Sequence, residues 1–189
     1  RTCGGGRIAD SHRVYLASAA PARKDASDFA RLSSACALGS VTVSCGRTDV
    51  PDLSFNRTRP EGQIDPTLTV ARLDRPDGST LAILANFGAH PTVWTELMPH
   101  SVTRDIPGFV CDGLEAERPG AIAMYLQGAC GDVNFHRHFA TEERCREPGE
   151  RLVAAAVKAL NQSRRGDGPV RFASTVARLP TRRWTREEI

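Results

Sequence analysis

Alternating hydrophobic and polar positions predict a β-hairpin near the middle of the chain. Residues 67–73 alternate, residues 75–78 (Arg-Pro-Asp-Gly) have the composition of a tight turn, and residues 81–87 form the returning strand. The second strand is apolar on both faces, which is typical of a strand in the interior of a sheet. Another apolar run, residues 121–126, predicts a further buried strand.

Helical periodicity is present on both sides of these strands. Residues 24–38 have apolar side chains at the spacing of an amphipathic helix, and residues 151–161 are rich in Ala, Leu and Val. Pro107 suits the first turn of a helix that ends near Glu117. Short strands are predicted over residues 41–45 and 170–179, and long loops over residues 47–63 and 93–105.

Together these elements predict a mixed α/β fold in a single partial domain, residues 1–189, with a central, largely buried mixed β-sheet flanked by helices. The chain begins at Arg1, and another helix is predicted to begin near residue 186. We therefore expect the interior of a longer domain, incomplete at both ends. Residues 1–10 lack the plan of a signal peptide, and no run approaches the ~18 apolar residues of a membrane span.

The composition excludes several classes of protein. Hydrophobic residues make up 40% and charged residues 25% of the chain, as in soluble globular domains. The net charge is only +3 and the arginines are spread along the sequence, which argues against a nucleic-acid partner. The six cysteines form no CxxC pair, which argues against a zinc ribbon. Buried thiols and disulfides both remain open interpretations.

Each of the two apolar strands, residues 81–87 and 121–126, is followed by a short turn that contains a polar side chain. His90 follows the strand over residues 81–87, and Pro91 stiffens the exit. An imidazole there can present a nitrogen to a site at the edge of the sheet, as a zinc ligand or a proton shuttle. A core histidine bonded to the backbone is the alternative. In the second turn, residues 128–132, Asp132 can orient a ligand histidine or cap the turn.

The other polar candidates are weaker. His136 and His138 form an HxH pair in a polar loop, where solvated side chains are the favoured interpretation, and His12 and His100 carry no stronger signal. Asp105, just before a predicted helix, is first of all a candidate cap. No signature of a serine hydrolase, zincin, P-loop or dinucleotide-binding protein is present.

Taken in order, five segments resemble the N-terminal catalytic domain of the neutral/alkaline non-lysosomal ceramidase family, especially its bacterial members of uncharacterised substrate. The resemblance runs from about Tyr15 to the C-terminus. The segments are Asn56-Arg57, Ile-Asp-Pro (64–66), Asn-Phe-Gly-Ala-His-Pro-Thr (86–92), Ser-Val-Thr-Arg-Asp-Ile-Pro-Gly (101–108) and Gln-Gly-Ala-Cys-Gly-Asp-Val-Asn (127–134). That family hydrolyses the amide of ceramide with a catalytic zinc.

The resemblance implies roles for particular residues. His90 matches one zinc-ligating histidine, and Arg57 matches the arginine that contacts substrate near the scissile amide. Asp105 and Asp132 fall in segments that line the pocket. One Zn²⁺ ion would polarise the carbonyl and lower the pKa of its water toward ~7, and the arginine would stabilise the oxyanion. The other zinc ligands are expected outside this chain, so we expect the chain alone to be inactive.

Asn134 departs from the family pattern. Ceramidases carry at this position a serine that acts at the scissile amide, whereas an amide side chain cannot serve as a nucleophile. Either zinc-bound water attacks directly or the substrate is not ceramide. The family's upstream His-x-His segment also has no match here.

These observations predict a zinc-dependent hydrolase of a linear amide bond resembling neutral ceramidase, with a small-molecule or lipid-like amide as its partner. The alternatives are a hydrolase of a non-lipid amide or ester, and a non-catalytic binding domain that kept the fold. A secreted or periplasmic location is implied by the resemblance alone.

Overall fold

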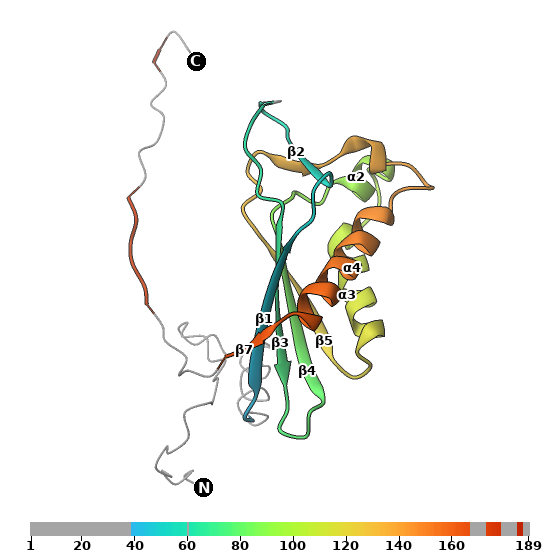
Figure 1. Ribbon diagram of the computed structural model, residues 1–189. Helices are drawn as coiled ribbons and strands as arrows, with labels where there is room; N and C mark the ends of the chain where they lie inside the picture. Colours follow the sequence, from blue (N-terminus) through green and yellow to red (C-terminus); the bar gives the residue numbers. More distant parts are fainter. Residues whose placement is uncertain (1–38, 60, 167–172, 179–184, 187–189) are drawn as a thin grey trace, which may run out of the picture.

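The centre of the molecule is a five-stranded mixed sheet with the strand order β5-β4-β3-β1-β7 (Figure 1). The computed structural model describes residues 39–59, 61–166, 173–178 and 185–186. All neighbours in the sheet are antiparallel except β4 and β5, which are parallel. The mixed α/β prediction is therefore confirmed. The strands are β1 (Thr42–Asp49), β3 (Thr67–Asp74), β4 (Thr80–Phe87), β5 (Ile122–Gln127) and β7 (Arg164–Arg165).

The hairpin predicted from the alternating pattern is formed by β3 and β4. Its turn is closed by backbone hydrogen bonds from Gly78 N to Arg75 O (2.9 Å) and from Arg75 N to Ser79 O (2.8 Å). Gly78 has a φ of 84°, in the left-handed region that favours glycine. The carboxylate of Asp77 accepts hydrogen bonds from the amide and hydroxyl of Ser79. Local turn chemistry therefore fixes the register of this strand pair.

A second, two-stranded sheet pairs β2 (Ser54–Asn56) with β6 (Val133–Phe135) in antiparallel register. Strand β2 lies within the loop predicted over residues 47–63, and β6 lies in a segment for which the sequence predicts no strand. A short helix, α2 (Val93–Leu97), also interrupts the loop predicted over residues 93–105. The loop predictions are wrong here because three-residue strands and a five-residue helix are too short to show a period.

Two longer helices pack together against one face of the large sheet (Figure 1). They are α3 (Asp105–Glu117) and α4 (Glu147–Asn161), and a 3₁₀ turn spans Arg137–Phe139. The helix α4 begins four residues earlier than its hydrophobic run predicts, because Pro148 occupies its first turn. Fully buried side chains from the strands and both helices form one core, among them Leu68, Ile83, Phe87, Val110, Leu114 and Leu152.

The opposite face of the sheet is apolar along β5. Ala123 points into the core, whereas Ile122, Met124 and Leu126 are 61%, 43% and 44% exposed. Within the described ranges, the flanking helices thus cover one face only. None of the helices in the described part of the chain is long and apolar enough to cross a membrane.

Some predicted elements are not found or lie elsewhere. Residues 173–178 have no regular secondary structure, so the strand predicted over residues 170–179 is wrong for that part. The helix predicted over residues 24–38 lies outside the described residues, as does His12.

Asp105 joins the beginnings of two helices. It is buried (5% exposed) with a φ of 49°, and it is the first residue of α3 rather than the residue before it. Its Oδ2 accepts hydrogen bonds from the amides of Trp94 (2.8 Å) and Thr95 (3.2 Å) in α2, and its Oδ1 accepts one from Ile106 N (2.7 Å). The carboxylate therefore caps α2 and fixes it against α3.

We expect Asp105→Ala to lower the free energy of unfolding by about 1–3 kcal/mol, because two amides at the beginning of α2 lose their buried acceptor. Asp105→Asn should cost less, since asparagine keeps one acceptor oxygen and tolerates the left-handed region. Asp112→Ala, which removes only an exposed ion pair with Arg104, the residue before α3, should leave stability nearly unchanged. Urea unfolding of the three variants tests this, and equal losses in the Asp105→Ala and Asp112→Ala variants would contradict it.

Candidate functional site

The parallel strands β4 and β5 bring two turns together at one edge of the sheet. Phe87 and Gln127, the last residues of the two strands, are Cα partners. The turns that follow, residues 88–92 and 128–132, are joined by hydrogen bonds from Gln127 Nε2 to Ala89 O (3.0 Å) and from Gly128 N to Phe87 O (3.0 Å). The carboxyl edge of a parallel pair is a common place for a ligand site in α/β proteins.

Two glycines allow the turns to approach this closely. A Cβ on Gly128 would lie 3.0 Å from the Cα of Gly88, and a Cβ on Gly88 would lie 2.9 Å from the carbonyl oxygen of Ala129. Neither position can carry a side chain without moving backbone. The close approach of the two turns therefore depends on glycine at both positions.

His90 is fixed by its backbone and has an exposed side chain. Its amide donates a hydrogen bond to Val133 O (2.8 Å), and the residue forms an isolated parallel bridge with Asn134. The ring Nδ1 lies 3.6 Å from the Sγ of Cys130. Because the side chain is exposed, the alternative of a core histidine is wrong.

Arg57 and Asp132 form a second contact, which joins the turn over residues 128–132 to the end of β2. The Nη2 of Arg57 donates to Gly131 O (2.7 Å), and its backbone amide donates to Asp132 O (2.7 Å). The carboxylate of Asp132 accepts a hydrogen bond from Asn56 Nδ2 (2.8 Å). Asp132 is thus engaged with Asn56 rather than with the ring of His90, and it holds Arg57 beside the turn.

Asn134 is buried in β6, with 7% of its surface exposed. Its Nδ2 donates a long hydrogen bond to Thr92 Oγ1 (3.4 Å), two residues beyond His90. Among the described residues, its Oδ1 has no hydrogen-bond partner. A buried acceptor without a partner costs about 1–3 kcal/mol, which a ligand in the site would recover.

The other three histidines of the described ranges, His100, His136 and His138, do not form a metal-binding group with His90. The rings of His136 and His138 stack with their centroids 5.3 Å apart. Burial lowers the pKa of His136, and positive charge on His138 acts in the same direction. No group of three or more His, Cys, Asp or Glu side chains in the described ranges is arranged to hold a metal ion. His100 is an exposed loop residue.

Cys130 also lies at this edge, and the sequence analysis predicts no role for it. Its position follows from the parallel register of β4 and β5, which spacing along the chain does not reveal. It has a free thiol, like Cys45, Cys111 and Cys145. Tyr125 on β5 supports the same edge: burial raises its pKa, and its hydroxyl donates to Phe87 O (3.3 Å).

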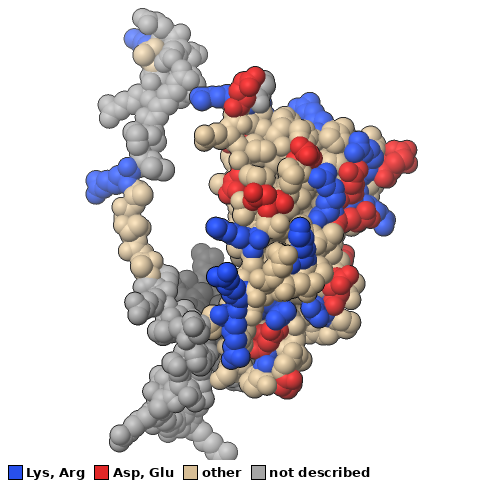
Figure 2. Space-filling view, in the orientation of Figure 1, with Lys and Arg blue, Asp and Glu red and all other residues tan. Residues whose placement is uncertain are grey.

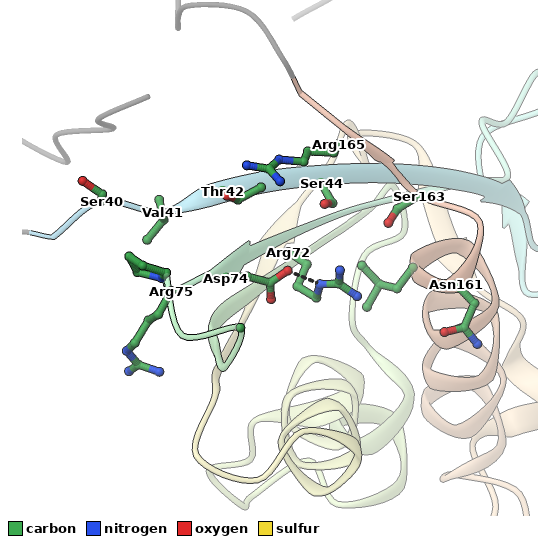
Figure 3. A pocket seen from close by; sticks show the side chains of 13 residues that line it. Ser40, Val41, Thr42, Ser44, Arg72, Asp74, Arg75, Asn161, Ser163 and Arg165 are labelled. Atoms are coloured by element: carbon green, nitrogen blue, oxygen red, sulfur yellow. Dashed lines mark hydrogen bonds and ion pairs between the residues drawn. The ribbon is translucent and has the colours of Figure 1, made fainter. Parts of the chain in front are cut away.

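A cavity of about 740 Å³ lies at the opposite end of the sheet (Figure 3). The start of β1, the hairpin turn and the end of α4 line it, and its Arg72 and Asp74 form an ion pair at 2.8 Å. Basic side chains gather over part of the face that Figure 2 shows, with acidic ones among them. None of the candidate catalytic or metal-binding residues that the sequence indicates lines this cavity.

The fold is similar to solved structures of ceramidases. The neutral ceramidase of Pseudomonas aeruginosa matches with a TM-score of 0.59 and 21% identity, over 70% of this chain and 25% of that one. A ceramidase complexed with C2 matches with a TM-score of 0.59 and 20% identity, over 70% of this chain and 24% of that one. The chain thus spans about a quarter of the length of these proteins. No family model matches the sequence, and no curated protein matches it.

We expect Gly128→Ala to destabilise the protein by about 1–3 kcal/mol, because the added methyl group meets the backbone of Gly88. Gly131→Ala is the matched control in the same turn, since a Cβ there meets nothing within 4 Å. The control should stay within about 0.5 kcal/mol of the wild type. Urea unfolding measures both variants, and a control as unstable as Gly128→Ala would show that the close contact is not the cause.

Proposed function

We propose that this chain supplies part of the active site of a zinc-dependent hydrolase that cleaves a linear amide bond, as a neutral ceramidase does. One observation carries the proposal: at the carboxyl edge of β4 and β5, the exposed imidazole of His90 lies on one of the two adjoining turns, and the guanidinium of Arg57 donates a hydrogen bond to the other turn, at Gly131 O. The similarity of the fold to ceramidase structures supports the same assignment.

The residues at this edge suit a zinc ion. His90 offers an accessible imidazole nitrogen, the thiol of Cys130 lies beside it, and the Oδ1 of Asn134 is a buried acceptor without a partner in the described part of the chain. A catalytic zinc site usually has three protein ligands, so the proposal requires further ligands from outside the described residues. When bound, zinc polarises a carbonyl and lowers the pKa of its water to about 7.

Arg57 stabilises negative charge on the substrate oxygen in this proposal. One of its donors binds Gly131 O, which fixes the planar guanidinium and leaves other N–H groups to face the substrate. Asp132 is a positioning residue in this proposal. Its carboxylate accepts a hydrogen bond from Asn56, and its carbonyl oxygen accepts one from the amide of Arg57. The two residues therefore form one rigid unit with the turn.

Asn134 favours a second candidate, a hydrolase of a non-lipid amide or ester. Its side chain cannot attack a carbonyl, but its buried Oδ1 can accept a hydrogen bond from a substrate N–H or O–H group. An N–H or O–H group of either class of substrate could satisfy this acceptor. The absence of a side-chain nucleophile at this position is therefore what favours the non-lipid candidate.

We expect His90→Ala to weaken zinc binding by at least about tenfold, because even the loss of a residue that only supports a ligand costs that much. The affinity can be measured by competition with a chromophoric chelator, with elemental analysis to count the ions. His100→Ala, which removes an exposed histidine from a loop, is the control and should bind zinc as the wild type does. A folded His90→Ala variant with unchanged affinity would exclude His90 as a ligand.

Replacing Asn134 with Ser separates the two candidate substrates. In the zinc-loaded, intact protein, Asn134→Ser should raise the rate of ceramide hydrolysis if the site is built for ceramide, because a hydroxyl is restored where ceramidases carry one. Asn134→Ala controls for the loss of the amide alone. If both variants fold and bind zinc but neither gains activity, the non-lipid substrate is favoured. Fatty acid release measures the rate.

A further inference from the structure

The thiol of Cys130 and the ring of His90 meet at the carboxyl edge of the sheet, where Sγ and Nδ1 are 3.6 Å apart. We propose that Cys130 is a second ligand of the metal that His90 binds, so that the edge carries a thiolate–imidazole pair. This inference rests on the proposed function, because it requires a metal at His90. It adds a ligand that neither the sequence nor the comparisons assign.

The separation of the two atoms fits a shared metal ion. Zinc lies at about 2.3 Å from a thiolate and at about 2.0–2.1 Å from an imidazole nitrogen, and tetrahedral angles then place the two ligand atoms about 3.5–3.6 Å apart. The observed 3.6 Å, the length of a thiol–imidazole hydrogen bond, also agrees with this spacing. A tetrahedral ion that replaced the shared proton would therefore need no change in the separation of the two ligand atoms.

Both turns are held in place by backbone hydrogen bonds. His90 N donates to Val133 O (2.8 Å), and Val133 N donates to Cys130 O (3.2 Å), so one residue connects the two ligands. The close contact of Gly88 with Gly128 fixes the turns from the strand side. Because the pair is preorganised, metal binding requires little ordering of side chains.

The surroundings suit a bound cation. The side chain of His90 is exposed and that of Cys130 is partly exposed, so an ion reaches them from solvent. A metal binds the thiolate form of cysteine and releases its proton. Asn134, the bridge partner of His90, has a buried Oδ1 without a partner among the described residues.

Cobalt(II) titration of the reduced, intact protein, which includes the ligands expected outside this chain, tests the inference without an activity assay. Cobalt takes the place of zinc, and a thiolate ligand produces a sulfur-to-cobalt charge-transfer band in the near ultraviolet. We expect this band to saturate at one cobalt per chain and to disappear in Cys130→Ser. Cys45→Ser, which removes an exposed cysteine on β1, is the matched control and should keep the band. His90→Ala should lose cobalt binding.

Alkylation gives a second readout. Zinc at ten times its dissociation constant should slow the reaction of Cys130 with iodoacetamide about elevenfold, because only the metal-free fraction reacts. The reaction of Cys45 should keep its rate. Mass spectrometry of the peptides measures both sites in one sample.

The outcomes separate this inference from the proposed function. Cobalt that binds through His90 without a charge-transfer band, or with a band that persists in Cys130→Ser, overturns the role of Cys130 and leaves that of His90 intact. An intact wild-type protein, with the ligands from outside this chain present, that binds no cobalt overturns both. A third outcome is fast alkylation of Cys130 that slows in His90→Ala but does not change when zinc is added. That result would identify a thiol nucleophile activated by an imidazole, and it would overturn the ligand assignment.

Discussion

The parallel pairing of β4 with β5 is the constraint on which the site depends. It ends both strands at one edge, and the contact between Gly88 and Gly128 then brings the two following turns within backbone contact. His90 and Cys130 lie on different turns, so any slip of this register would separate them. A side chain at either glycine would have the same effect.

The rest of the site depends on this edge. The turn after β5 leads into β6, which pairs with β2 and so places Arg57 against the carbonyl oxygen of Gly131. On the other side, the turn after β4 leads into α2, and Asp105 caps that helix from the start of α3. The polar residues of the site are therefore held by backbone groups and buried caps, and the two longer helices supply the core that supports them.

The sequence predicts the long, periodic elements and misses those made by distant pairing. The hairpin, β5, α3 and α4 have clear hydrophobic periods or turn residues, and all are present. Strands β2 and β6 form only because segments far apart in the chain meet. His90 is recognisable because a buried strand ends just before it. Cys130 is not, because the parallel register that sets it beside His90 has no local signal. Asp105 is recognisable as a cap, but the helix it caps lies earlier in the chain.

The central claim is that these two turns form a metal-binding centre, and an anomalous diffraction experiment tests it most directly. Crystals of the intact protein soaked in zinc would be measured on both sides of the zinc absorption edge. We expect an anomalous peak within bonding distance of the imidazole of His90 and the thiol of Cys130. Zinc peaks elsewhere on the molecule, with none beside His90, would contradict it.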